Sequence, residues 1–273
     1  MSERLPLSAD IHLENLTIIR GGKPILKDIN LALKKEKITV IMGASGCGKS
    51  TLLKTAAGLI PPDHGKVLVN GKDIYTMNDR ESSSLHRQWG FVFQDAALWA
   101  NRSVLQNLTI PLLYHQHQMS PGEAEERAVS LVRKTGYRDE MHLRPSQLST
   151  GEMMMVSFAR AFISSPSVLF LDSPFLAVDH GSTANMKTMI SSLRRRGGTV
   201  IAIFQDPKYI AQVAEELIIM KDGEILACGA FSEIINTKDR TITTEIAELF
   251  EQSASYDGSI LDLLSGSEDD PFS

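Results

Sequence analysis

The chain has 273 residues and a net charge of −5, with 42% hydrophobic and 22% charged residues. This balance is typical of a folded protein, and the length is enough for one large domain or for a domain with an inserted subdomain. The negative net charge gives no electrostatic reason to expect a nucleic acid as a partner, so no nucleic acid is predicted. The sequence has no apolar run of about 18 residues, the length that would predict a membrane span.

The N-terminal residues and the cysteines suggest a compartment. Residues 1–10, MSERLPLSAD, lack an apolar stretch behind a basic end, so they do not have the pattern of a secretory signal. Two cysteines, Cys47 and Cys228, are consistent with a reducing compartment. Together these features predict a cytoplasmic chain.

Residues 1–90 alternate β-rich segments with turns. Residues 12–19 predict a strand, and residues 21–24, GGKP, predict a turn after it. Residues 38–42, ITVIM, form a short continuous apolar run of the kind expected for a strand buried on both faces. Residues 66–74 predict a hairpin around Asn70 and Gly71.

A glycine-rich segment, residues 43–51, follows the strand at 38–42 and precedes a predicted helix. Its sequence, GASGCGKST, matches the P-loop pattern G-x-x-x-x-G-K-[ST] in the strand-to-helix context that the pattern requires. Glycines let backbone amides curl around a phosphate, the lysine reaches the β- and γ-phosphates, and the following serine contacts Mg²⁺. A chance glycine-rich turn is the alternative. The residues predicted to bind ATP here are Gly43, Ser45, Gly46, Cys47, Gly48, Lys49, Ser50 and Thr51.

The second half of the chain predicts a helical region and then more buried strands. Residues from about 96 to 165 are expected to be mostly helical, and the best-marked helix follows Ser120, with Glu123 completing a capping box and Gly136 ending it. Residues 167–172 and 198–204 predict buried strands on either side of a helix from about 182 to 195. Residues 217–229 predict a final hairpin around Asp222 and Gly223.

Asp172 ends an apolar strand and is the expected second contact to Mg²⁺. An aspartate at a strand end is weak evidence alone. Together with the P-loop it becomes strong, because the two strands can lie adjacent in one parallel sheet.

Six motifs that follow the P-loop in order make the chain similar to the ATP-binding subunits of ABC transporters, over about residues 10–240. The P-loop is followed by FVFQD, whose Gln94 matches the Q-loop glutamine, and by QLSTGE at 147–152, which resembles the signature LSGGQ. The strand ending at Asp172 comes next, and then LAVD, whose Asp179 matches the D-loop aspartate. FQD at 204–206 lies at the switch position, and MKDGEIL resembles the closing hairpin.

The resemblance implies an α/β fold of the P-loop NTPase class, with a mostly parallel core sheet, an antiparallel β subdomain and an inserted helical subdomain at about 96–165. It implies that two ATP-binding subunits pair head to tail, as a homodimer or a heterodimer. Each ATP then lies between one P-loop and the partner's signature segment, so Ser149, Gly151 and Asp179 are candidate nucleotide contacts. Gln94 is implied to sense Mg²⁺ and the membrane partner.

Arg20 aligns with a position where many members of the family carry an aromatic residue that stacks on adenine. A guanidinium can also stack on a base, so Arg20 is a candidate contact to the nucleotide. A role without nucleotide contact is the alternative.

A narrower resemblance rests on EKITVIMGASGCGKSTLLK, on FQDAALW and on the arginine at position 20. These stretches are similar to the ATPases of bacterial MCE-type lipid transport systems, which move lipids between membranes. The likeness implies integral membrane permease subunits as partners, and a peripheral location on the cytoplasmic face of the inner (plasma) membrane.

The chain departs from the family pattern at positions that serve hydrolysis. Ser173 stands where the family usually has a catalytic glutamate, and Gln205 stands where it has the switch histidine. At Ser173, the missing general base costs about 10²- to 10⁴-fold in rate. At Gln205, the amide can donate a hydrogen bond but cannot carry a proton. Within the signature segment, Thr150 replaces a glycine and Glu152 replaces a glutamine.

These departures predict intact binding of ATP and Mg²⁺ with slow hydrolysis. The candidate catalytic residues are Ser173, Gln205 and Gln94, and the candidate metal ligands are Ser50, Gln94 and Asp172. The function predicted first is energy coupling in a membrane transporter, and the alternative is a catalytically degenerate, nucleotide-gated regulatory or interaction protein. Neutral drift, with another group supplying the missing function, also remains open.

The last segment, residues 251–273, has no Lys or Arg and contains several acids. Such a composition is typical of a solvated tail. A docking segment is the alternative, because Ile260, Leu261, Leu263 and Leu264 are apolar without an obvious core to join. The expected division is an ABC-type ATP-binding domain at 1–240 and an acidic C-terminal extension at 241–273.

Overall fold

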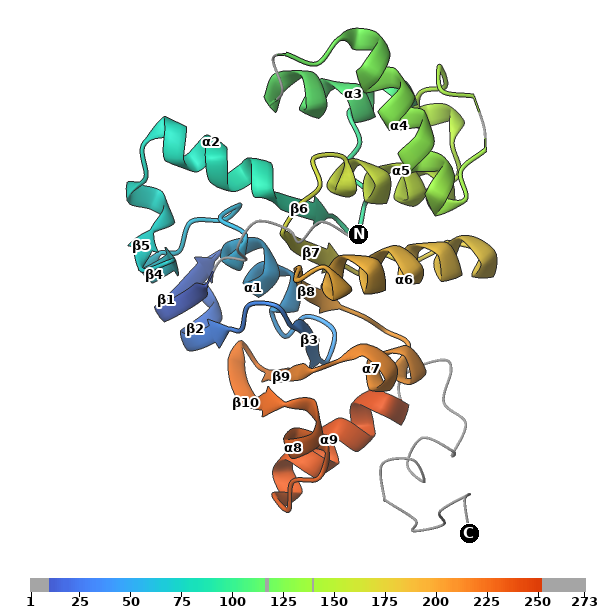
Figure 1. Ribbon diagram of the computed structural model, residues 1–273. Helices are drawn as coiled ribbons and strands as arrows, with labels where there is room; N and C mark the ends of the chain where they lie inside the picture. The colour runs from blue at the N-terminus through green and yellow to red at the C-terminus, as the bar shows by residue number, and fades with distance from the viewer. Residues whose placement is uncertain (1–9, 116–117, 139, 252–273) are drawn as a thin grey trace.

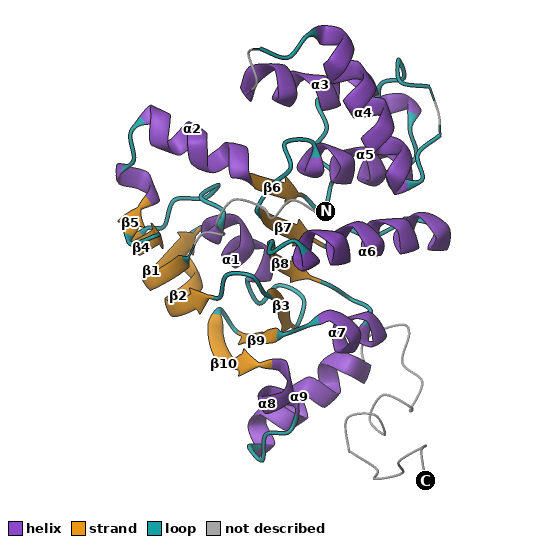
Figure 2. Ribbon diagram, viewed as in Figure 1, coloured by secondary structure: helices purple, strands orange, loops and turns teal. Residues whose placement is uncertain are grey.

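A computed structural model of the chain describes residues 10–115, 118–138 and 140–251. Its strands form two sheets, one of four strands and one of six. Figure 1 shows the helices α3, α4 and α5 together at the top of the molecule and α7, α8 and α9 at the bottom. The six-stranded sheet lies between these two groups, and Figure 2 shows helices next to both of its faces.

The six-stranded sheet has the order β10-β9-β3-β8-β7-β6. Neighbouring strands are parallel except for the antiparallel pair β9 and β10. This arrangement confirms the expected, mostly parallel core sheet and the closing hairpin. The strands span β3 Ile38–Gly43, β6 Trp89–Val92, β7 Val168–Asp172, β8 Thr199–Ile203, β9 Glu216–Lys221 and β10 Glu224–Ala230.

The central strands separate two hydrophobic cores. Along β3, Val40 and Met42 face the core that includes residues of α3 to α6. Ile41 faces the core that lies between the six-stranded and four-stranded sheets. Successive strand side chains point to opposite faces, so a strand covered on both faces must be apolar throughout. This is why the runs at 38–42 and 168–171 are buried and mostly apolar, without alternation.

The sequence suggested that the strands of the P-loop and of Asp172 can lie adjacent. In the structure they are separated by one strand. β8 pairs with β3 on one side and with β7 on the other. The apolar composition of a buried strand does not encode its position in the sheet. The carboxyl ends of all three parallel strands nevertheless open at one edge, so the P-loop and Asp172 still meet across the end of β8.

The four-stranded sheet is antiparallel and has the order β2-β1-β4-β5. It confirms the expected antiparallel subdomain, with the turn of the β4–β5 hairpin at Asn70 and Gly71, whose φ angles are 51° and 78°. The turn expected at 21–24 is shorter than predicted, because β2 already begins at Lys23. The strands span β1 Ile11–Arg20, β2 Lys23–Leu33, β4 His64–Val69 and β5 Lys72–Asp73.

The helices follow local capping signals in the sequence. α4 begins after Ser120, which forms the expected capping box with Glu123, and it ends at Gly136 in a left-handed conformation. α6 starts two residues earlier than predicted, because Asp179 caps it by accepting from the Ser182 amide. The described helices are α1 Lys49–Ala56, α2 Asp79–Gln88, α3 Val104–His115, α4 Pro121–Thr135, α5 Thr150–Phe162, α6 His180–Arg195, α7 Pro207–Val213, α8 Phe231–Ile235 and α9 Arg240–Glu251, with short 3-10 turns at Ile74–Thr76 and Pro145–Gln147.

One helix was missed within the range expected to alternate strands and turns. α2 is preceded by Asn78, whose side chain accepts from the Glu81 amide while Glu81 accepts from the Asn78 amide. That reciprocal pair is a capping box that can be found in the sequence. The segment has no fully buried side chain, so it lacks the apolar stripe that marks most helices.

The helix α9 continues across the expected boundary after residue 240. Ile246 and Phe250 on α9 are 6% and 1% exposed and belong to the main core. Residues 240–251 therefore pack on the domain that the preceding residues form. The boundary itself stays a prediction, as does the helical insert, within whose expected range α3, α4 and α5 lie. The proposed docking residues Ile260, Leu261, Leu263 and Leu264 lie outside the described residues.

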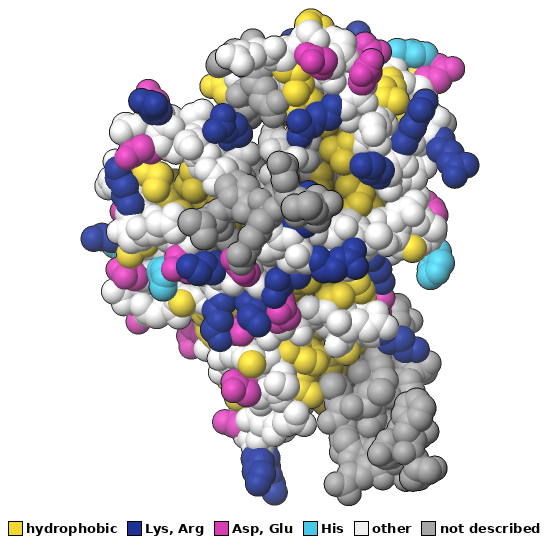
Figure 3. Space-filling model, viewed as in Figure 1, with side chains coloured by type: hydrophobic (Ala, Val, Ile, Leu, Met, Phe, Trp, Pro, Cys, Tyr) yellow, Lys and Arg dark blue, Asp and Glu magenta, His cyan; other side chains and the backbone are white. Residues whose placement is uncertain are grey.

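Each helix in the described part of the chain is too short or too polar to cross a membrane. On the face shown in Figure 3, basic and acidic side chains are interspersed.

Candidate nucleotide-binding site

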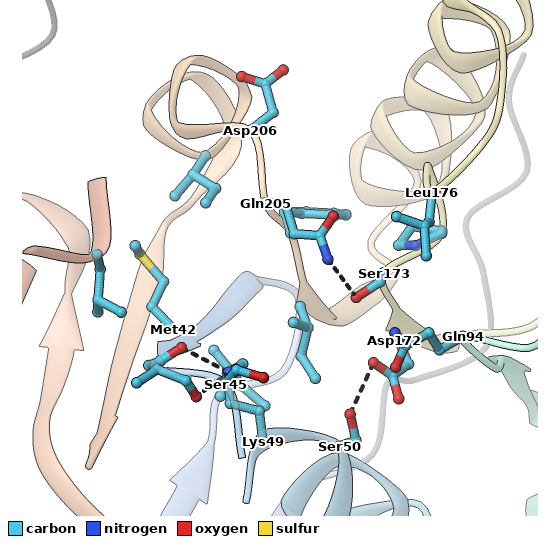
Figure 4. A pocket seen from close by; sticks show the side chains of 18 of the residues that line it. Met42, Ser45, Lys49, Ser50, Gln94, Asp172, Ser173, Leu176, Gln205 and Asp206 are labelled. Atoms are coloured by element: carbon cyan, nitrogen blue, oxygen red, sulfur yellow. Dashed lines mark hydrogen bonds between the residues drawn. The ribbon is translucent and has the colours of Figure 1, made fainter. Parts of the chain in front are cut away.

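A cavity of about 810 Å³ opens at the carboxyl ends of β3, β7 and β8. Figure 4 shows side chains from these strands and from the segments that follow them turned toward this space. The cavity brings together most of the residues singled out in the sequence, which are Gly43, Ser45, Gly46, Gly48, Lys49, Ser50, Thr51, Gln94, Asp172, Ser173 and Gln205.

The P-loop presents the uncapped start of α1 to the cavity. Gly48 precedes the helix with a φ of 105°, no side chain caps the first turn, and no acid lies in it. A Cβ at Gly48 would lie 2.9 Å from the Ile25 carbonyl oxygen, so only glycine fits. The unpaired amides and the positive end of the helix dipole then face the cavity, which is the arrangement that binds phosphate.

Lys49 is held at the inner edge of the P-loop. Its Nζ donates to the carbonyl oxygens of Gly43 at 2.7 Å and Ala44 at 2.8 Å. These bonds place the ammonium beside the amides of the loop. A lysine so placed supplies a positive charge to the outer phosphates of a nucleotide.

Asp172 and Ser50 form a donor set that fits a divalent cation. The Ser50 hydroxyl donates to Asp172 Oδ1 at 3.1 Å, whereas Asp172 Oδ2 is buried and has no hydrogen-bond partner among the described residues. Burial raises the pKa of this carboxyl, and the Ser50 hydrogen bond, Lys54 and Lys49 oppose that rise. An unpaired buried oxygen is costly unless a partner such as a cation completes it.

Ser173 and Gln205 meet in the wall of the cavity. Gln205 Nε2 donates to Ser173 Oγ at 3.4 Å, as Figure 4 shows. Ser173 has a φ of 53°, a left-handed conformation that is uncommon for a residue with a side chain, and its amide donates to the Ile203 carbonyl. The positions of the expected general base and of the expected switch residue are therefore in contact, and both side chains are neutral.

Gln94 follows the end of β6 and lines the same cavity. Figure 4 shows its side chain beside Asp172. An amide oxygen at this point can coordinate a cation directly or through water.

Ser149, Gly151 and Asp179 do not line the cavity, and each has a local role. Ser149 caps α5 in a reciprocal capping box with Glu152, whose carboxylate accepts from the Ser149 amide at 2.6 Å. A Cβ at Gly151 would lie 2.4 Å from the Ala177 carbonyl oxygen, so glycine lets the start of α5 contact the segment before α6. Asp179 caps α6, and the hydrogen bonds to Ser182 hold its pKa below the usual range.

Two further predicted contacts are not among the residues that line the cavity. Arg20 is at the end of β1, with a half-exposed side chain 3.6 Å from the Asp63 carboxylate. Cys47 contributes its backbone to the P-loop, but its side chain is buried in the core that lies between the six-stranded and four-stranded sheets. Desolvation by burial raises the pKa of the Cys47 thiol, while Lys49 opposes the rise.

Several residues that line the cavity were not expected from the sequence. Leu249 and Phe250 reach it from α9, beyond the expected domain boundary. The apolar residues of α9, Ile242, Ile246, Leu249 and Phe250, recur with helical spacing, a pattern that would have placed this helix against the core. Phe175 and Leu176, just after Ser173, also line the cavity.

The sequence profile of the ABC transporter family matches residues 26–176. The chain belongs to the ABC transporter family. Solved ABC cassettes support this membership. A dimeric ATP-binding cassette in a post-hydrolysis state, bound to ADP and Pi, has a TM-score of 0.73 and is 30% identical, over 81% of this chain and 98% of that one.

Two curated relatives illustrate the range of ABC proteins that the chain resembles. The intermembrane phospholipid transport system ATP-binding protein MlaF of Haemophilus influenzae is 31% identical over 230 residues, which are 84% of this chain and 87% of that protein. The macrolide export ATP-binding/permease protein MacB of Bartonella henselae is 36% identical over 215 residues, which are 78% of this chain and 32% of that longer protein.

These findings confirm two predictions. The fold is that of the P-loop NTPase class, as in the ABC cassettes. The chain is an ATP-binding subunit of the ABC transporter type, a family whose cassettes bind adenine nucleotides and dimerise.

Proposed function

We propose that this ABC subunit binds ATP and Mg²⁺ and couples binding, with slow hydrolysis, to lipid transport by a membrane complex. The observation that carries the proposal is the neutral contact between Ser173 and Gln205 beside an intact phosphate site. The cavity holds the P-loop, Lys49 and the Ser50–Asp172 pair that this chain offers to phosphate and Mg²⁺, whereas the chemistry that activates water is reduced.

Binding of the nucleotide rests on three groups. The open first turn of α1 receives the phosphates, Lys49 adds positive charge, and Ser50 with Asp172 offers oxygen ligands to Mg²⁺. Mg²⁺ would supply charge neutralisation at the phosphate oxygens. Gln94 stands beside this set and would complete it.

Slow hydrolysis follows from the residues beside the phosphate site. A serine hydroxyl can orient water but is a poor base near neutral pH, so about 10²- to 10⁴-fold of general-base help is missing. The Gln205 amide donates to Ser173 and can also donate to a phosphate, but it cannot shuttle a proton. Turnover below the usual enzyme range, which begins near about 1 s⁻¹, is therefore expected.

The lipid cargo and the partners in this proposal are supported by similarity to a relative. MlaF, named as part of an intermembrane phospholipid transport system, matches most of this chain at 31% identity. By that similarity the chain acts as a peripheral subunit on the cytoplasmic face of the inner membrane. Its partners are integral membrane permease subunits and a second ATP-binding subunit, which is either another copy or a related chain.

A nucleotide-gated regulatory or interaction protein is the second candidate function. The Ser173–Gln205 contact favours it, because both positions that serve hydrolysis are neutral while the phosphate site is intact. The two candidates differ in their partners. Co-purification with integral membrane proteins supports the transporter subunit, and their absence from the purified complex supports the regulatory protein.

The test is phosphate release by the purified chain together with its co-purifying membrane partners. Lys49→Ala is the control, since removal of the ammonium should abolish ATP binding. Slow release above the control supports the proposal. Release at the control level with ATP still bound indicates a nucleotide-gated protein instead, and unchanged ATP affinity in Lys49→Ala would contradict the site.

Ser173→Glu separates the missing base from other limits. We expect phosphate release to rise at least about tenfold, because a carboxylate at this position can polarise the attacking water. ATP affinity should stay within about twofold of wild type. If release does not rise, the missing carboxylate is not what limits the rate.

A further inference from the structure

Lys187 on α6 lies where two segments of the nucleotide site meet. One segment follows Asp172 and contains Phe175, and the other follows β8 and contains Phe204, Gln205 and Asp206. Lys187 itself does not line the cavity. No motif in the sequence singled it out.

The ammonium of Lys187 contacts an aromatic cluster. Its Nζ lies 4.1 Å from the centre of the Tyr209 ring and 5.5 Å from that of Phe175. The rings of Phe175 and Phe204 are stacked with centres 5.5 Å apart, and both contact Tyr209 edge to face. An ammonium over a ring is attracted by its negative face, so one charge holds rings from both segments.

The same ammonium also binds the residue next to Gln205. Lys187 Nζ donates to Asp206 Oδ2 at 3.1 Å, and the side chain of Lys187 is only 27% exposed. The other oxygen, Asp206 Oδ1, caps α7 by accepting from the amides of Lys208 and Tyr209. One carboxylate therefore joins α6 to the first turn of α7.

These contacts fix the direction of Gln205. In Figure 4 the side chain of Gln205 points to Ser173, whereas that of Asp206 points away from Ser173, on the other side of the same segment. Adjacent residues in an extended segment point to opposite sides, so anchoring Asp206 on the side of α6 directs Gln205 toward Ser173. Phe175, anchored by the same ammonium, follows Ser173 by two residues.

We propose that Lys187 is a positioning residue for ATP hydrolysis, acting through Asp206 and the aromatic cluster to hold Gln205 against Ser173 and the outer phosphate. The inference rests on the proposed function, because it concerns the same reaction. Its geometric part, the anchoring of the segment at 204–209, stands without that function.

The first test is a double-mutant cycle measured by phosphate release. Lys187→Met keeps the aliphatic stem over the rings and removes the charge, and Lys238→Met is the matched control at an exposed lysine. We expect Lys187→Met to lower kcat about tenfold with the KM for ATP within about twofold, because misplacement affects the reacting geometry rather than binding. Lys187→Arg should restore at least half of the rate, since a guanidinium can make the same contacts.

The cycle identifies the route of the effect. In a Gln205→Ala background, Lys187→Met should lower kcat less than twofold further, because the group that it positions is gone. The proposal would be overturned if Lys187→Met lowered kcat as much in the Gln205→Ala background as in wild type, or did not change kcat by itself. It would also be overturned if the change in activation free energy equalled the change in the free energy of unfolding.

The second test needs no hydrolysis. Hydrogen exchange of the nucleotide-free chain should be at least about threefold faster at the amides of Lys208 and Tyr209 in Lys187→Met than in wild type or Lys238→Met. Unchanged exchange overturns the inference. If exchange rises while wild-type phosphate release equals that of Lys49→Ala, the proposed hydrolysis fails and the anchoring by Lys187 stands.

Discussion

Two carboxyl groups of this protein show how surroundings decide ionisation at the scale of single residues. Asp172 is 1% exposed, and burial raises its pKa despite the Ser50 hydrogen bond. Glu215 is also partly desolvated, but hydrogen bonds from Arg194, the Ile38 amide and Lys37 outweigh this and lower its pKa to about 2. Asp172 keeps one oxygen that can bind a cation, whereas both oxygens of Glu215 accept hydrogen bonds that stabilise the fold.

Glu215 joins three elements that lie far apart in the sequence. Arg194 at the end of α6 donates to it through two nitrogens, at 2.6 and 2.9 Å, and Lys37 and the Ile38 amide donate from the start of β3. Glu215 itself immediately precedes β9. Bidentate arginine–carboxylate pairs are among the stronger ion pairs, so this one contributes more than an ordinary surface pair.

Replacing Glu215 with glutamine should lower the free energy of unfolding by about 1–2 kcal/mol at pH 7, after allowance for a side chain that is about a third exposed. The folded pKa of about 2 lies below the ordinary value of 4.5, so this stabilisation is complete above about pH 4.5 and is lost as the pH falls toward 2. Urea unfolding at pH 7 and pH 3 measures it. Glu126→Gln, at an exposed site on α4, is the control, and a wild-type advantage that is equal at both pH values would contradict the assignment.

At the scale of elements, Arg160 ties α5 to the segment that carries Gln94. Its guanidinium donates to the carbonyl oxygens of Ala96 and Ala97, two alanines with φ angles of 61° and 45°. Left-handed conformations are unfavourable for residues with side chains, so these bonds help to hold a strained turn. Burial lowers the pKa of Arg160 to about 10, which still leaves it charged at neutral pH.

The C-terminal helix α9 is the element that most changes the expected organisation. It contributes Ile246 and Phe250 to the main core, and Leu249 and Phe250 to the nucleotide cavity. Lys221, at the end of β9, also forms an ion pair with the buried Glu245. A segment expected to begin an extension thus packs on the main core, while the boundary itself stays a prediction.

Phe250→Ala should destabilise the protein by about 3–5 kcal/mol, because a fully buried ring leaves a cavity that the core fills only partly. Glu248→Ala, exposed on the same helix, should change the free energy of unfolding by less than about 0.5 kcal/mol. Denaturant unfolding of both variants measures the difference. Similar stability of the two variants would mean that α9 does not pack on the core in solution.

At the scale of the whole molecule, the family resemblance predicts that a partner chain completes each nucleotide site. Ser149 and Gly151 do not line the cavity of their own chain, and their contact with ATP bound by a partner stays a prediction. A solved cassette with 30% identity is dimeric. With a weak general base, a dimer closed around ATP should open slowly.

We expect ATP with Mg²⁺ to convert the purified chain into a long-lived dimer without any mutation that blocks hydrolysis. Light scattering after size-exclusion chromatography should show the dimer with ATP and the monomer without nucleotide. Lys49→Ala should remain monomeric, and Ser173→Glu should shorten the life of the dimer, since faster hydrolysis removes the γ-phosphate that bridges the subunits. A dimer that forms equally without nucleotide would contradict this account.

The sequence by itself determined the features that depend on neighbouring residues. The P-loop, the capping box of α4 and the hairpin at Asn70 and Gly71 each follow from local backbone requirements, and the buried strands follow from continuous apolar runs. The order of motifs was sufficient to predict the family and the class of fold. It also pointed to Ser173 and Gln205 as departures from the family pattern.

Only the tertiary structure decided which of these segments meet. The insertion of β8 between β3 and β7, the return of α9 to the cavity and the contact of Lys187 with Asp206 all join residues that are distant in the chain. Such contacts depend on strand order and on packing between elements, and neither is encoded in local periodicity. The same reason explains why the Ser173–Gln205 hydrogen bond could be found only in the folded chain.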